Sequence, residues 1–137
     1  MEAGVIIFTG IFGALLTWFI NNHRAKGAIR ASVLPSLIVG LFFYCFPNLL
    51  SEYLTRHIPL VFIGSSFIGM VSINIISKWI YVAISGIVFG LIYLNTGTFF
   101  NGFGGALGTT ACIAVLVAIG FAKLIKHRGI KKKNSVE

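Results

Sequence analysis

The chain has 137 residues, of which 57% are hydrophobic and only 10% are charged, and its formal net charge is +8. Soluble domains carry about 25% charged residues, so this composition excludes an ordinary soluble protein and predicts an all-α integral membrane protein. The chain is too short to hold a separate soluble catalytic module beside its apolar segments. Its basic residues flank those segments, where they would meet anionic lipid headgroups, so nucleic acid is not expected as a partner.

Five apolar segments follow one another along the chain. They cover residues 3–20, 31–50, 58–76, 80–94 and 103–125. The first three carry no ionisable group and are close to the ~20 residues that cross ~30 Å of hydrocarbon. The fourth is shorter, about 23 Å as a helix, and Trp79 and Asn95 at its ends extend it. We therefore expect a compact bundle of five transmembrane helices over residues 1–126, followed by a basic cytoplasmic tail at 127–137.

The distribution of positive charge predicts the orientation of this bundle. Five crossings place every Lys and Arg except Arg56 on one side of the membrane. Positive residues favour the cytoplasmic side, which predicts an external N-terminus, a cytoplasmic C-terminus and a cell (inner or plasma) membrane location. Anionic lipid is the expected partner of this basic inner face. A four-span alternative, with residues 80–94 flat or re-entrant, would move Lys78 or the tail to the other side.

Small residues recur at helical spacing in every segment, and they let helix backbones approach closely in a membrane. We expect close helix packing at Gly10, Gly13, Gly69, Gly86, Gly90 and Gly108. A similar stripe in the second segment consists of Ser32, Ser36 and Gly40. The spacings Gly86–Gly90 and Gly104–Gly108 favour packing within one chain. Stripes on all five segments nevertheless exceed the needs of one small bundle, so a homo-oligomer or a larger membrane complex is expected.

Two segments also resemble each other. Residues 36–44 and 85–93 share a Ser, an Ile-Val pair and a final Tyr, and both would run from the inside to the outside. This similarity indicates a parallel helical-hairpin repeat, as found in many transporters. Chance similarity between apolar sequences is the alternative interpretation.

Prolines and cysteines give further local predictions. Pro35, Pro47 and Pro59 are interpreted as markers of helix boundaries, because proline removes a backbone hydrogen bond inside a helix. Cys45 and Cys112 lie in apolar segments without metal or redox spacing and are interpreted as small core residues.

Uncharged polar residues are the candidates for a functional path through the bundle. They are Ser65, Ser66, Ser72, Asn74, Thr109 and Thr110. Their hydroxyl and amide dipoles would either line a narrow polar path or form hydrogen bonds between helices. No ionisable residue lies in the middle of a segment, so we assign no catalytic residue, no metal ligand and no cofactor. His57, at the entrance of the third segment, is assigned no role.

The connection at residues 95–105 is rich in glycine and phenylalanine. Gly permits irregular backbone, so this stretch would either re-enter the membrane or form a turn anchored by its aromatic rings. In the first case it would build an outer vestibule from Asn95, Thr96, Thr98, Asn101, Gly104 and Gly105.

Two functions follow from these patterns. The leading hypothesis is an oligomeric channel or carrier component for an ion or a small polar solute. The alternative is a non-catalytic accessory or structural subunit of a larger membrane complex. An enzyme is not expected, because the serines of the third segment have no general base at their depth.

Overall fold

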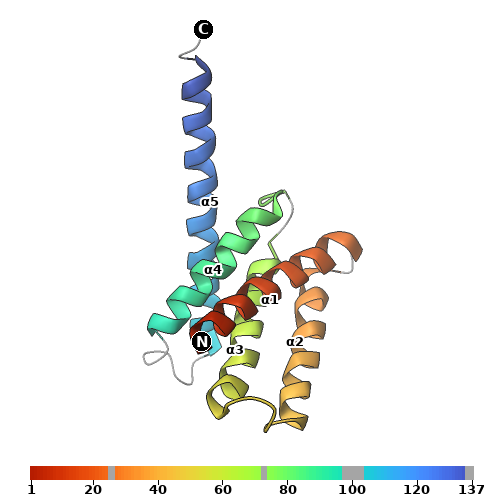
Figure 1. Cartoon of the computed structure of the whole chain (residues 1–137). Coiled ribbons are helices and arrows are strands. Elements are labelled where there is room, and N and C mark those ends of the chain that lie inside the picture. Colours follow the sequence, from red (N-terminus) through yellow and green to blue (C-terminus); the bar gives the residue numbers. More distant parts are fainter. Residues whose placement is uncertain (25–26, 72–73, 97–103, 135–137) are drawn as a thin grey trace.

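The computed structural model describes residues 1–24, 27–71, 74–96 and 104–134, and over these residues the chain forms five helices and no strand (Figure 1). The helices are α1 (Glu2–Arg24), α2 (Ala28–Cys45), α3 (Glu52–Gly69), α4 (Trp79–Thr96) and α5 (Gly104–Asn134). All except α3 are long and apolar enough to cross a membrane. The predictions of an all-helical fold and of several helices suited to a multi-pass membrane protein are confirmed.

The bounds of α3 differ most from the sequence prediction. This helix begins at Glu52 instead of residue 58 and ends at Gly69 instead of residue 76. The Ser51 hydroxyl accepts a hydrogen bond from the Leu54 N–H at 3.5 Å, and the Glu52 carboxylate lies in the first turn, where a negative charge is favourable. The capping signal at Ser51 therefore determines the start of α3, upstream of the first uncharged residue.

Two of the three helix-boundary assignments for proline were wrong, whereas Pro47 lies between α2 and α3 as predicted. Pro35 lies inside α2, where it is buried, and Pro59 lies inside α3. Each removes one backbone hydrogen bond from its helix. Tertiary packing contributes more to helix stability than local propensity, and here both helices continue through the proline.

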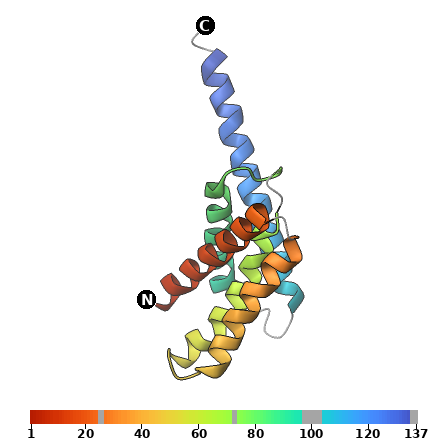
Figure 2. The same ribbon diagram turned by 90° about the vertical axis from the view of Figure 1, so that its right-hand side faces the viewer.

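The helices alternate in direction, and α3 lies at the centre of their arrangement (Figures 1 and 2). It contacts each of the other four helices, and half of its residues are buried. α1 crosses obliquely and packs most extensively against α3 and α4, whereas α2 contacts only α1 and α3 among the described helices. The last part of α5 extends beyond the bundle (Figure 1). With 31 residues, this helix is about 46 Å long.

Fully buried apolar side chains fill the interior of the bundle. The larger ones are Ile6, Val61, Ile68, Val82 and Phe89, and Ala14, Ala114 and Ala118 are also fully buried. The ring of Phe89 lies against Gly64, where a Cβ atom would overlap it. The absence of a side chain at Gly64 thus creates the space for the largest fully buried side chain of the core.

Candidate functional site

Two close helix crossings are built on glycines of the predicted stripes. Where α1 meets α4, a Cβ atom on Gly86 would lie 2.8 Å from the Ile11 Cα and 3.0 Å from the Gly10 carbonyl oxygen. A Cβ on Gly90 would lie 3.1 Å from the Ile7 Cα. At Gly86 a side chain would force the helices to shift, and at Gly90 it would be tighter than an ordinary contact, so backbone packs directly on backbone.

The crossing of α1 and α3 follows the same principle. A Cβ on Gly69 would lie 2.6 Å from the Ala14 carbonyl oxygen, and a Cβ on Gly13 would overlap the Ser65 hydroxyl. Gly108, in contrast, has no atom of another helix within 4 Å of its Cβ position. The sixth predicted contact therefore does not form within the described part of one chain.

Three of the polar residues predicted for a path form hydrogen bonds within their own helices. The Ser65 hydroxyl donates to the Phe62 carbonyl at 3.1 Å, within its own helix. Thr109 and Thr110 both donate to the Ala106 carbonyl, at 2.9 and 2.8 Å. Thr110 is buried, whereas Thr109 is exposed. Asn74 lies in the turn after α3 and is exposed, and Ser72 is outside the described residues.

Ser66 is the exception, because it forms a hydrogen bond between helices. Its hydroxyl oxygen lies 2.7 Å from that of Ser32 on α2, and both residues are buried. Ser66 itself donates to the Ile63 carbonyl at 2.7 Å, so Ser32 is the donor in the pair. Ser36 donates to the Ser32 carbonyl at 2.7 Å. These three serines form a hydroxyl cluster between α2 and α3.

The predicted outer vestibule is only partly described. Asn95 and Thr96 are the last residues of α4, and their side chains donate to the Leu91 and Ile92 carbonyls at 2.8 and 2.6 Å. Gly104 and Gly105 begin α5. Residues 97–103 lie outside the described residues, and they include Thr98, Asn101 and most of the predicted re-entrant stretch.

An aromatic and imidazole cluster at the beginning of α3 had no counterpart in the sequence predictions. The His57 Nδ1 lies 2.7 Å from the Tyr93 hydroxyl of α4. The His57 ring also packs on Tyr53, with 4.2 Å between ring centroids, and Tyr93 stacks on Phe89. The Ser51 cap and the four-residue spacing of Tyr53 and His57 were the available signals, because together they place both rings on one face of a helix.

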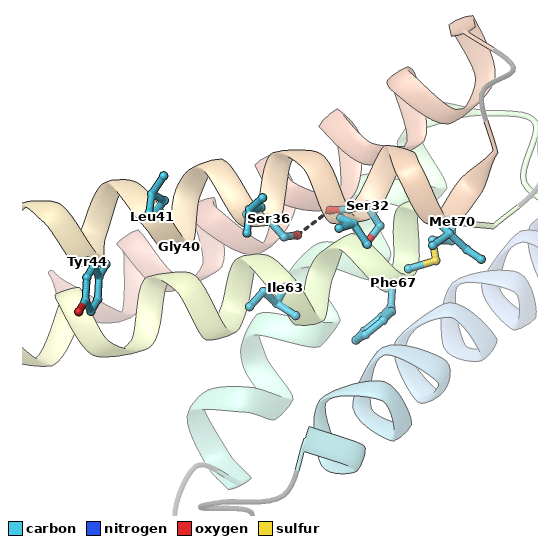
Figure 3. Close-up of a pocket in the computed structure, with 11 residues that line it drawn as sticks. Ser32, Ser36, Gly40, Leu41, Tyr44, Ile63, Phe67 and Met70 are labelled. Carbon is cyan, nitrogen blue, oxygen red and sulfur yellow. Dashed lines mark hydrogen bonds between the residues drawn. The ribbon is translucent and has the colours of Figure 1, made fainter.

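An apolar groove of about 780 Å³ runs between α2 and α3 and is open along one side (Figure 3). Its walls are Ile29, Ser32, Val33, Ser36, Leu37, Gly40, Leu41, Tyr44, Ile63, Phe67 and Met70. The predicted Ser32–Ser36–Gly40 stripe lines this groove. Gly40 has no atom of another helix within 4 Å of its Cβ position, so it leaves open space where Gly86 makes contact.

The outer surface of the bundle carries both cysteines. Cys45 and Cys112 are exposed free thiols, so their interpretation as core residues was wrong. Their helices each present one face away from the bundle, and both cysteines lie on those faces. Among the described residues, no three His, Cys, Asp or Glu side chains are grouped as metal ligands would be. Comparisons with protein-family models, with curated proteins and with solved structures found no match to this chain.

Proposed function

We propose that the protein crosses the cell membrane five times, with its N-terminus outside and the end of α5 in the cytoplasm. α3 is less hydrophobic than a typical membrane-spanning helix. This is compatible with a crossing, because α3 contacts all four other helices and therefore exposes less of its surface to lipid. If α3 did not cross, the exposed Lys123, Lys126 and Arg128 of α5 would lie on the outside, against the positive-inside preference.

Cysteine labelling tests this topology. With Cys45 and Cys112 replaced by serine, Ser51→Cys and Arg128→Cys would be made singly. A membrane-impermeant maleimide applied to intact cells should label position 51 and should label position 128 only after permeabilisation. Labelling of both positions from the same side would refute five crossings.

We further propose that several copies assemble into a channel or carrier component for an ion or a small polar solute, with the path between copies. The observation that carries this proposal is the closed interior of one copy. Val61, Val82 and Phe89 are fully buried at its centre, and glycine crossings bring the backbones together. Because these side chains fill the centre of the described bundle, we place the path at the surfaces between copies.

The external face of α5 supports contact between copies. It carries Gly105, Thr109 and Cys112, all exposed and about one turn apart, and Gly120 two turns further on, beyond the exposed Leu116. Small residues of this kind allow a second helix to approach closely in lipid, where no hydrophobic drive brings helices together. The exposed Thr109 oxygen retains lone pairs that can accept from a passing solute.

Cross-linking and flux together test the oligomeric path. Mild oxidation in the membrane should link copies through Cys112 in a Cys45→Ser variant, whereas a Cys112→Ser variant that retains Cys45 should stay monomeric. Liposomes containing the cross-linkable variant should take up at least one solute of an ion and polar-solute panel. Efficient linkage through Cys45 alone, or the absence of any flux, would contradict the proposal.

A non-catalytic accessory subunit is the second candidate function. It is favoured by the part of α5 that extends beyond the bundle and exposes Lys123 and Lys126, because this cationic helix could dock on a larger complex. Copurification of a partner in fixed ratio, without flux from the purified chain alone, would select this function over transport.

A further inference from the structure

We propose that the groove between α2 and α3 binds one anionic phospholipid of the surrounding bilayer, with an acyl chain along the groove and the phosphate at Arg30. The inference rests on the proposed membrane insertion and is independent of transport. Its basis is the combination of an apolar groove, internally satisfied serines and a cation at one end.

The lining of the groove excludes a polar occupant along most of its length. Its two serines direct their hydroxyl hydrogens at protein oxygens: Ser32 at the Ser66 hydroxyl oxygen and Ser36 at the Ser32 carbonyl. Ser66, which does not line the groove, donates to the Ile63 carbonyl. No serine donor is therefore left for a solute. The remaining walls are aliphatic or aromatic, as Figure 3 shows for Leu41, Ile63 and Phe67.

The groove is long enough for one acyl chain. From Ile29 to Tyr44 its lining follows α2 for about 22 Å, at 1.5 Å per residue. One leaflet of a ~30 Å hydrocarbon core is about 15 Å thick. An acyl chain that begins at Ile29 and crosses one leaflet would thus end near Gly40. Gly40 provides the hollow in the wall at that depth, since no atom of another helix lies within 4 Å of its Cβ position.

The charge at the Ser32 end determines which lipid fits. Arg30 is exposed and lies directly after Ile29 and one turn before Val33, both of which line the groove. Its guanidinium can bind two oxygens of one phosphate, a geometry that a single ammonium group does not provide. A net negative headgroup is attracted to such a basic residue, whereas a zwitterionic headgroup gains less.

Two groove variants, each with a matched control, test the site. Gly40→Phe fills the hollow with a ring, and Gly4→Phe places the same ring on α1, where no atom of another helix lies within 4 Å of the Cβ position. Arg30→Gln removes the proposed phosphate ligand, and Arg56→Gln removes an exposed charge from α3, on the opposite side of the proposed bundle. Each protein would be extracted from vesicles of equal phosphatidylglycerol and phosphatidylcholine, and its retained lipid would be quantified by mass spectrometry.

The wild type should retain phosphatidylglycerol over phosphatidylcholine by about fivefold, the ratio expected from one basic residue at the lipid surface. Arg30→Gln should bring this ratio close to one, and Gly40→Phe should lower the total lipid retained, whereas both controls should match the wild type. Equal retention of the two lipids by the wild type would overturn the proposal, as would unchanged behaviour of Arg30→Gln. If Gly40→Phe does not fold, Arg30→Gln decides the question alone.

Cross-linking distinguishes the lipid from a second protein copy in the groove. If Gly40→Phe lowers the yield of cross-linked dimer and leaves lipid retention unchanged, the groove holds a helix of another copy, and the proposal is wrong. Failure of transport would leave the lipid ratio unaffected, because the retained lipid is measured without flux.

Discussion

The contact between α1 and α4 gives the sharpest test of the fold through Gly86→Ala. The added Cβ would lie 2.8 Å from the Ile11 Cα, so the helices would need to separate by about 0.6 Å to reach an ordinary 3.4 Å contact. The three atoms nearest to the new methyl group, the Ile11 Cα and N and the Gly10 carbonyl oxygen, all belong to backbone, which cannot rotate away. Overpacking of this kind costs about 1–3 kcal/mol, whereas replacement of a mid-helix Gly by Ala favours the helix by up to about 1 kcal/mol.

Gly40→Ala is the matched control for this prediction, because Gly40 is also in mid-helix but has open space at its Cβ position. Unfolding of both variants by sodium dodecyl sulfate in dodecylmaltoside micelles would be followed by far-ultraviolet circular dichroism. Gly86→Ala should be less stable than Gly40→Ala by about 1–3 kcal/mol, because the comparison cancels the gain in helix propensity. Equal stability of the two variants would refute the backbone contact.

Two further substitutions probe the interior by the same unfolding measurement. Tyr93→Phe should lower the free energy of unfolding by about 1 kcal/mol, since it removes the hydroxyl that lies 2.7 Å from the His57 Nδ1. Tyr44→Phe, at an exposed position, is the control and should change this free energy little. Equal effects of the two substitutions would exclude a stabilising role for the His57–Tyr93 pair. Phe89→Ala should lower the free energy of unfolding by about 3–5 kcal/mol, because it leaves a cavity against Gly64. Phe121→Ala, which removes an exposed ring, is the control. If both substitutions have equally small effects, the core closes the cavity without loss of stability, and the prediction is wrong.

The sequence predicted the number and order of the helices well, because long apolar runs leave few alternatives to helix in a membrane. It failed at the beginning of α3. The criterion of an uncharged run excluded Glu52, Arg56 and His57, although capping by Ser51 and packing among four neighbours place all three in the helix. Hydropathy describes exposure to lipid, so it is least informative for the helix that other helices surround.

The candidate site was predictable as a set of residue types but not as a set of contacts. A stripe of small residues indicates that some surface is closely approached, yet it does not identify the partner. Gly86 and Gly108 occupy similar stripes, and only Gly86 meets another helix of the chain. Likewise, Ser66 bonds across to Ser32, whereas Ser65 bonds within its own helix. The two serines are neighbours in α3, and their different positions around the helix decide whether each hydroxyl bonds to another helix or to its own. Composition carries no information about these positions.

The closed interior separates the effects of substitutions on stability from their effects on function. Residues such as Phe89 and Gly86 bind helices to one another, so their replacement should act on folding and alter activity only through the amount of folded protein. The unpartnered features lie at the perimeter: the α2–α3 groove and the external face of α5. Gly40 and Cys112 mark these surfaces, on different helices that make no contact with each other in the described chain. Their substitutions should therefore act additively, with Gly40→Phe changing the retained lipid and Cys112→Ser changing the contact between copies.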